Sequence, residues 1–332
     1  MKLKLFLIVF IVNTISLYAN DCEKMKLPFE TNNKKYYIDI CNSLVKEKIP
    51  LKYIFNNFDY KYNKKINEID NITLKIFGGN KIIKKKIANN ELKANIYLKS
   101  KIEKLNKNLI EYKDIYDLTK KDYKVHPEVI AAIMYKETKF GKILGKHNAF
   151  VTANTMLRKL DEKKYKNYLK MSRSSLIHLI KYNYKHNIDI NKKLVASYAG
   201  AIGIPQFMPF NLWLVKSYKN KIPNLMTIED AIPSIGNYIK YKCKKINMEF
   251  KWKPKRKWNN FVNEWNEMNF KHSHIGLYKN NKYYSQSFYE NYKDKKFLNE
   301  IKPEIKCILK YNNSYNYAIG VLDLSYTSHY NK

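Results

Sequence analysis

Residues 127–141 read Pro-Glu-Val-Ile-Ala-Ala-Ile-Met-Tyr-Lys-Glu-Thr-Lys-Phe-Gly, and their spacing predicts a helix with one buried face. Pro127 suits the first turn of a helix, because its missing N–H has no partner to lose there. An apolar stripe follows at helical spacing, made of Val129, Ile130, Ile133 and Met134. Gly141 is typical of the residue that follows a helix end.

Glu137 continues this apolar stripe, since it lies three residues after Met134 and four after Ile133, whereas Lys136 and Lys139 fall on other faces. A carboxyl on an apolar face loses hydration, which raises its pKa by disfavouring the charged form. A raised pKa is what a general acid for glycosidic cleavage needs. The same position also fits a glutamate that only caps the helix or forms a salt bridge.

A second informative stretch covers residues 196–209. It is rich in small residues, namely Ala196, Ala199, Gly200, Ala201 and Gly203. Small side chains let backbone or substrate approach closely, and Ser197 and Gln206 add polar groups that could position a ligand. A helix-packing seam would show the same composition. No G-x-S-x-G pattern surrounds Ser197, so the sequence does not favour a serine nucleophile.

The first residues carry the pattern of a secretory signal peptide. Lys2 and Lys4 precede a mostly apolar run from Leu5 to Leu17, and Ala19 offers a cleavage position. The run is short for a membrane span. Asp21 stands before Cys22 where a lipoprotein needs a small residue. We therefore expect a periplasmic protein that would associate with the inner membrane only if its signal remained uncleaved.

Composition restricts the partners. The 332 residues include 63 Lys+Arg and 29 Asp+Glu, which gives a formal net charge of +34. Such a charge favours anionic partners, although an AT-rich genome would also produce many lysines. Nucleic acid, an anionic membrane and an anionic cell wall all qualify as partners, and export argues against nucleic acid.

Four cysteines remain after signal cleavage, and export permits disulfides. They are Cys22, Cys41, Cys243 and Cys307. Three pairings are open; the most local joins Cys22 to Cys41 and Cys243 to Cys307, and free buried thiols are the alternative. No C-x-x-C pair is present, which argues against a zinc site.

Further stretches with helical spacing or composition cover residues 35–58, 97–124, 161–190 and 227–245. The Tyr- and Asn-rich tail from residue 270 is expected to hold short strands before a final apolar stretch at Tyr317 to Leu324.

Four runs of this chain resemble the signatures of one enzyme family. They are Val125 to Gly141, Ser197 to Pro209, Asp230 to Tyr238 and Tyr311 to Val321. They are similar, in the same order, to those of the lytic murein transglycosylase B family, glycoside hydrolase family 103. The resemblance covers about residues 95–325.

The resemblance implies a mainly α, lysozyme-like fold with a small β-containing subregion. Together with the signal peptide at 1–19, it divides the chain into an N-terminal helical segment at 20–94 that packs on the core and matches the family only weakly, and a catalytic region at 95–332. It leads us to expect peptidoglycan glycan strands as the partner and a monomeric protein. Glu137 matches the single catalytic acid and base. The implied substrate-binding residues are Ser197, Gln206, Tyr238, Tyr311, Asn312, Tyr317 and Tyr97.

The implied activity is lytic transglycosylation of peptidoglycan. Cleavage between N-acetylmuramic acid and N-acetylglucosamine would leave 1,6-anhydromuramic acid ends. The alternatives are a non-catalytic peptidoglycan-binding protein and a hydrolytic muramidase. Some relatives carry a calcium loop between the second and third signatures, but lysines stand among Asn220, Asn224 and Asp230 here. We therefore expect neither a metal nor another cofactor.

Overall fold

The computed structural model describes residues 21–78, 101–192, 194–219, 222–244, 250–272 and 286–331. The predicted signal peptide, the predicted boundary at 94/95 and Tyr97 lie outside these residues. In the described part, no helix is both long enough and apolar enough to cross a membrane. The elements are α2 (Lys34–Lys46), α3 (Leu51–Asn57), α4 (Asn71–Phe77), α6 (Ile102–Glu111), α7 (Lys113–Tyr123), α8 (Pro127–Thr138), β1 (His147–Asn148), α9 (Ala149–Lys159), α10 (Glu162–Lys185), β2 (Val195–Ala196), η2 (Pro209–Leu214), α11 (Ile228–Cys243), α12 (Lys255–His272), α14 (Lys295–Ile308) and α15 (Tyr315–Tyr330).

The chain forms two compact units, and each contains two separate stretches of sequence. The first unit consists of Met1–Gly79 and Leu144–Trp213, and the second of Asn80–Ile143 and Leu214–Lys332. The predicted catalytic region, 95–332, therefore contributes to both units.

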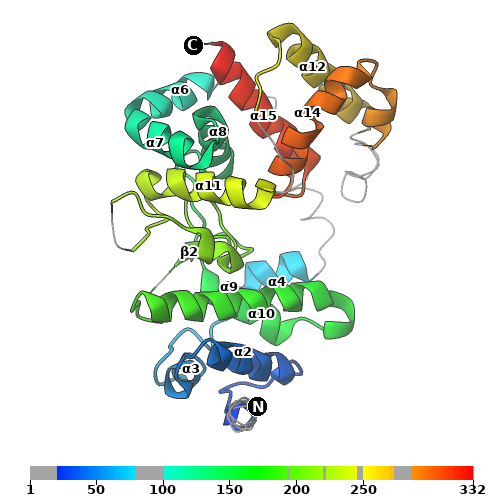
Figure 1. The fold of residues 1–332 in the computed structure, drawn as a ribbon. Helices are drawn as coiled ribbons and strands as arrows, with labels where there is room; N and C mark the ends of the chain where they lie inside the picture. The colour runs from blue at the N-terminus through cyan, green and yellow to red at the C-terminus, as the bar shows by residue number, and fades with distance from the viewer. Residues whose placement is uncertain are drawn as a thin grey trace, which may run out of the picture. The chain divides into compact units, whose positions relative to one another are not determined.

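The core of the first unit lies between α2, α9 and α10. The long helix α10 packs against both α9 and α2, and α4 packs against α9 (Figure 1). Tyr37 on α2 is fully buried, and its hydroxyl donates to Asn154 Oδ1 on α9 at 2.7 Å. This hydrogen bond satisfies two polar groups inside an otherwise apolar core. The predicted helix over 161–190 corresponds to α10.

The sheet of the first unit has two short antiparallel strands, β1 and β2. His147 pairs with Ala196, and Asn148 pairs with Val195. Gly145, just before β1, lies so close to β2 that a Cβ atom added to it would stand 1.8 Å from the Ala196 carbonyl oxygen. Only a residue without a side chain allows this approach of the two backbones.

We expect Gly145→Ala to lower the free energy of unfolding by about 2–3 kcal/mol, because a backbone carbonyl cannot yield as a side chain can. Urea denaturation followed by fluorescence measures the change. Lys146→Ala alters the adjacent exposed residue and serves as the control. Equal stability of the two variants would show that the close approach does not constrain the fold.

The second unit is built around α8. Helices α6, α7, α11 and α15 all pack against it, and every residue from Glu128 to Tyr135 is buried. The predicted helix is present, but the prediction of a single buried face is wrong, because neighbouring helices cover α8 on several sides. Ala131 and Ala132, which interrupt the stripe of large side chains, are small enough for close helix contacts.

The C-terminal tail differs from its predicted strands. The described part, 286–331, holds helices, including α14 and α15. Both α14 and α15 start at a capping side chain. Asp294 accepts from the Phe297 N–H at 2.9 Å, and Ser314 accepts from the Tyr317 N–H at 3.3 Å. These caps and extensive burial outweigh the strand preference of tyrosine.

Both disulfides of the most local pairing are present. Cys22–Cys41 joins the N-terminal turn of the first unit to α2, and Cys243–Cys307 joins α11 to α14 in the second unit. This result confirms the local pairing and excludes the alternative of free buried thiols, since no cysteine in the described residues is free.

Candidate active site

Glu137 lies in the last turn of α8, in the second unit. The stripe positions before it, Ile133 and Met134, are fully buried, whereas Glu137 is half-buried. The central packing of α8 therefore places a carboxyl group at the point where the buried helix reaches the surface of its unit. This position agrees with the predicted acid, whose raised pKa remains a prediction.

The chain turns sharply after Glu137. Lys139, Phe140 and Gly141 all have positive φ angles, of 50°, 59° and 83°. Thr138 holds this turn, because its hydroxyl accepts from the Gly141 N–H at 3.0 Å. The helix thus ends at Thr138, with Lys139 rather than Gly141 in the left-handed cap position. Two non-glycine residues in this backbone region carry strain, and the turn fixes the helix end that bears Glu137.

Three of the predicted substrate-binding residues form what we call the tyrosine row: Tyr238, Tyr311 and Tyr317. The ring centroids of Tyr238 and Tyr311 lie 4.9 Å apart at an interplanar angle of 60°, and those of Tyr311 and Tyr317 lie 6.3 Å apart with nearly parallel planes. The Tyr238 hydroxyl donates to the Lys310 carbonyl at 2.8 Å. The row therefore joins α11, the turn after α14 and the start of α15.

The tyrosine row is electrostatically linked to Glu137. Burial raises the pKa of the Tyr311 hydroxyl well above its usual value, and the negative charge of Glu137 raises it further. Burial also raises the pKa of Tyr238 to about 12. Both hydroxyls therefore stay protonated at neutral pH, and the Tyr238 hydroxyl uses its proton in the hydrogen bond to the Lys310 carbonyl.

Asn312 lies in the turn between α14 and α15 and is exposed. Its backbone N–H donates to the Ile308 carbonyl at 3.2 Å, and its carbonyl accepts from the Ser314 N–H at 2.8 Å. The backbone of Asn312 thus shapes the turn, and its side chain is exposed next to Tyr311. Glu137, the tyrosine row and Asn312 all belong to the second unit.

Ser197 and Gln206 belong to the first unit, in the loop after β2. The Ser197 hydroxyl accepts from the N–H groups of Ala199 and Ala201 at 3.4 and 3.2 Å. Gln206 has a φ of 51°, and its side-chain amide donates to the Gly203 carbonyl at 2.8 Å. Both side chains hold the backbone of this loop, which is a structural role beside the predicted substrate contact.

The loop that carries calcium in some relatives is closed here by Asp230. One carboxylate oxygen accepts from the Tyr218 N–H at 2.8 Å and the Ser217 hydroxyl at 3.1 Å, and the other accepts from the Asn224 N–H at 2.7 Å. Asp230 thus holds the described part of this loop through three hydrogen bonds, and Asn220 lies outside the described residues. In the described part of the chain, no group of three or more His, Cys, Asp or Glu side chains could hold a metal.

The sequence reasoning missed two polar clusters. In the second unit, Glu304 on α14 is buried, accepts from the Tyr326 hydroxyl at 2.9 Å, and has a pKa raised by burial to about 7. In the first unit, Asp70 caps α4 and contacts His147 Nδ1 at 2.5 Å. Glu304 occupies a stripe position on its helix, so the spacing that indicated Glu137 could also have indicated Glu304.

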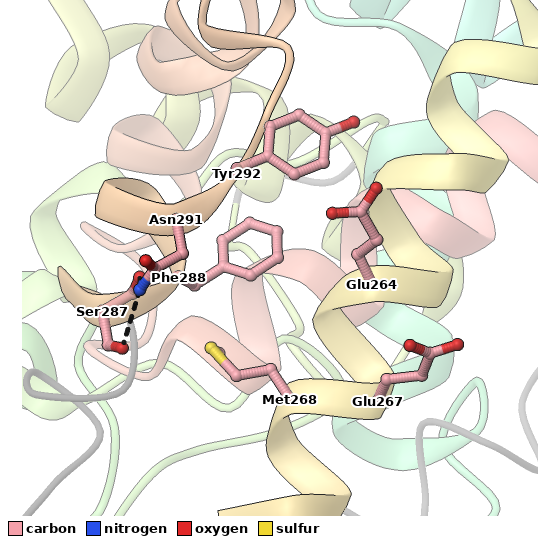
Figure 2. A pocket seen from close by; sticks show the side chains of 7 residues that line it. All are labelled: Glu264, Glu267, Met268, Ser287, Phe288, Asn291 and Tyr292. Atoms are coloured by element: carbon pink, nitrogen blue, oxygen red, sulfur yellow. Dashed lines mark hydrogen bonds between the residues drawn. The ribbon is translucent and has the colours of Figure 1, made fainter.

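A separate hollow of about 250 Å³ lies in the second unit. Figure 2 shows Glu264, Glu267 and Met268 of α12 on one side and Phe288 on the other, with Ser287 hydrogen-bonded to Asn291. None of the predicted site residues lines this hollow, so it is not the candidate active site.

The Transglycosylase SLT domain family matches residues 62–326 of this chain. Among solved structures, the chain resembles the lytic transglycosylase SLT35 of Escherichia coli in complex with bulgecin A, with 15% identity, 92% and 96% of the two chains covered and a TM-score of 0.57. It also resembles SltB1 of Pseudomonas aeruginosa, with 14% identity, 88% and 97% coverage and a TM-score of 0.52.

A third similar structure is SltB3 of Pseudomonas aeruginosa in complex with NAG-NAM-pentapeptide, with 14% identity, 88% and 78% coverage and a TM-score of 0.54. Identities this low show the fold. No curated protein sequence matches the chain.

The mainly helical architecture, with its small two-stranded sheet, is lysozyme-like. The chain belongs to the Transglycosylase SLT domain family, whose match extends over most of its length. The predicted fold class and the predicted enzyme class, a lytic transglycosylase, are thereby confirmed.

Proposed function

We propose that this chain cleaves the β-1,4 bond between N-acetylmuramic acid and N-acetylglucosamine in peptidoglycan and leaves 1,6-anhydromuramic acid ends, with Glu137 as acid and then base. The observation that carries the proposal is the half-buried Glu137 at the end of α8, electrostatically linked to Tyr311. Peptidoglycan as the substrate is supported by the family match and by the NAG-NAM-pentapeptide bound to the similar SltB3.

In the first step, protonated Glu137 donates its proton to the oxygen that links the two sugars. The bond from this oxygen to C1 of the muramic acid breaks, and positive charge develops at C1. The 2-acetamido group of the same sugar can stabilise this charge, as in substrate-assisted glycosidases. A half-buried carboxyl suits this step, because partial burial favours the neutral acid while leaving it accessible.

In the second step, ionised Glu137 takes the proton from the C6 hydroxyl of the muramic acid. The C6 oxygen then bonds to C1, which closes the 1,6-anhydro ring and returns Glu137 to its protonated form. No water is consumed. One carboxyl group is sufficient, whereas retaining and inverting glycosidases commonly use two.

The predicted substrate contacts divide by chemistry. The half-buried Tyr311 can offer its hydroxyl to the sugars, and the exposed Asn312 can offer its amide. Tyr238 and Tyr317 are buried, so they act by positioning Tyr311 rather than by direct contact with the sugars. Ser197 and Gln206 remain predicted contacts from the first unit, and Tyr97 is predicted from the sequence alone.

We place the enzyme in the periplasm, exported by the signal peptide at 1–19 and acting as a monomer. Two disulfides support this placement, because such bonds persist in oxidising compartments. The net charge of +34 suits a protein that works on an anionic cell wall.

Mass spectrometry of purified sacculi digested by the protein tests the proposed function. We expect soluble muropeptides with anhydro ends, each lighter by one water than its hydrolytic counterpart. A hydrolytic muramidase digested in parallel provides the reference for reducing ends. Reducing ends from this protein would indicate a muramidase, and an absence of soluble products would indicate a binding protein.

A further inference from the structure

Lys136 is the residue before Glu137 on α8, and its side chain contacts the ring of Tyr317 on α15. Its ammonium nitrogen lies 5.3 Å from the centroid of the Tyr317 ring. This distance is within the range of a cation–π interaction, in which the negative face of an aromatic ring attracts a cation. Lys136 is half-buried, which reduces the screening of this attraction by water.

The contact continues through the tyrosine row toward the catalytic group. The Tyr317 ring lies nearly parallel to the Tyr311 ring at 6.3 Å, and the Tyr311 hydroxyl lies within electrostatic reach of Glu137. Two consecutive residues of α8 therefore act on the tyrosine row in different ways. Lys136 covers one end through its cation, and Glu137 acts on the middle through its charge.

The other end of the tyrosine row is held in a similar way. The Lys242 ammonium lies 5.4 Å from the centroid of the Tyr238 ring, and the Tyr238 hydroxyl donates to the Lys310 carbonyl. The row thus has a cation near the ring at each end, and Tyr238 is also held by a backbone hydrogen bond.

We propose that Lys136 is a positioning residue for the transglycosylase reaction, holding the Tyr317 face of the tyrosine row against the catalytic end of α8. This inference rests on the proposed function of Glu137. A positioning residue that acts through Tyr317 should affect turnover more than substrate binding, because it fixes groups around the reacting bond.

The test is a double-mutant cycle on the full mature protein, with anhydro-muropeptide release from soluble glycan strands as the readout. We expect Lys136→Met, which keeps the length of the side chain and removes its charge, to lower kcat about tenfold with KM changed less than about twofold. Lys136→Arg keeps a cation over the ring and should retain at least about half of the wild-type kcat. Lys121→Met removes one charge from an exposed position on α7 and is the matched control.

The second arm of the cycle uses Tyr317→Leu, which removes the ring. If Lys136 acts through Tyr317, Lys136→Met should lower kcat by less than about twofold in this background, because the partner is already absent. Independent effects that multiply in the double variant would overturn the proposal, as would a change confined to KM or an unchanged kcat in Lys136→Met. Lys136→Gln replaces the methionine variant if that variant misfolds.

Failure of this proposal can be distinguished from failure of the proposed function. A wild-type protein that releases no anhydro-muropeptides refutes the proposed function before any Lys136 variant is compared.

Discussion

Replacement of Glu137 by glutamine is expected to lower the release of anhydro-muropeptides at least about a thousandfold, since one carboxyl group performs both proton transfers. General acid–base catalysis contributes about 10²–10⁴ in rate, and glutamine can neither donate nor accept the proton as a carboxyl does. Glutamine has nearly the shape of glutamate and the residue is only half-buried, so the variant should fold like the wild type. Product analysis by mass spectrometry and a melting curve together check both expectations.

A matched control comes from Glu304, a buried glutamate of the same unit. Glu304→Gln makes the same chemical change at a stripe position on α14, where the side chain accepts from the Tyr326 hydroxyl and the Lys251 N–H. The glutamine oxygen can still accept from the Lys251 N–H, and its NH₂ group can donate to the Tyr326 hydroxyl, which can keep its own proton on the Lys251 carbonyl at 3.2 Å. The activity should therefore stay within about threefold of wild type. Substantial anhydro-muropeptide release by Glu137→Gln would refute the assignment of the acid, whatever the control shows.

The comparison of these two glutamates shows how far sequence spacing identifies a catalytic residue. Glu137 and Glu304 both lie at helical spacing from large apolar side chains, and spacing alone does not separate them. In the structure, Glu304 is almost inaccessible, whereas Glu137 is half-buried and electrostatically linked to a tyrosine from a distant part of the chain. The resemblance of the whole run 125–141 to a family signature favoured Glu137 over Glu304. Helical spacing alone does not carry this information.

The fold was predictable where local signals and burial agree. Pro127 at the first helical position marks the start of α8, and the helices predicted at 161–190 and 227–245 correspond to α10 and α11. In the described part of the tail, 286–331, the predicted strands are wrong, because tyrosine favours strands by itself, whereas here Tyr317 and Tyr326 are buried against neighbouring helices. The pairing of β1 with β2 joins segments about 50 residues apart, and no local pattern specifies such a contact.

For the substrate-binding residues, the sequence predicted local features of the chain but not contacts between distant helices. Small residues at 196–203 indicated a tight loop, and the structure shows that Ser197 and Gln206 hold this loop through hydrogen bonds to its own backbone. The contact between Lys136 and the Tyr317 ring was not predictable, because it depends on how α15 packs against α8.

Removal of the Cys243–Cys307 disulfide is expected to have the largest effect on stability. The two cysteines are 64 residues apart in sequence, and a cross-link stabilises mainly by restricting the unfolded chain, more strongly for longer loops. We expect the double variant Cys243→Ala/Cys307→Ala to lower the free energy of unfolding by about 4 kcal/mol, and Cys22→Ala/Cys41→Ala, with a separation of 19 residues, by about 3 kcal/mol. Urea denaturation under oxidising conditions measures both.

Loss of the two disulfides should differ more clearly in its effect on catalytic activity than in its effect on the free energy of unfolding. Cys243–Cys307 links α11, which bears Tyr238, to α14, whose following turn bears Tyr311. Its loss should loosen the Tyr238–Tyr311 pair and lower kcat under conditions in which the protein remains folded, because misplaced groups around a reacting bond slow turnover. Cys22–Cys41 belongs to the first unit, so its loss should leave kcat per folded molecule within about twofold. Equal loss of kcat in both double variants would contradict a specific role of Cys243–Cys307 in placing the tyrosine row.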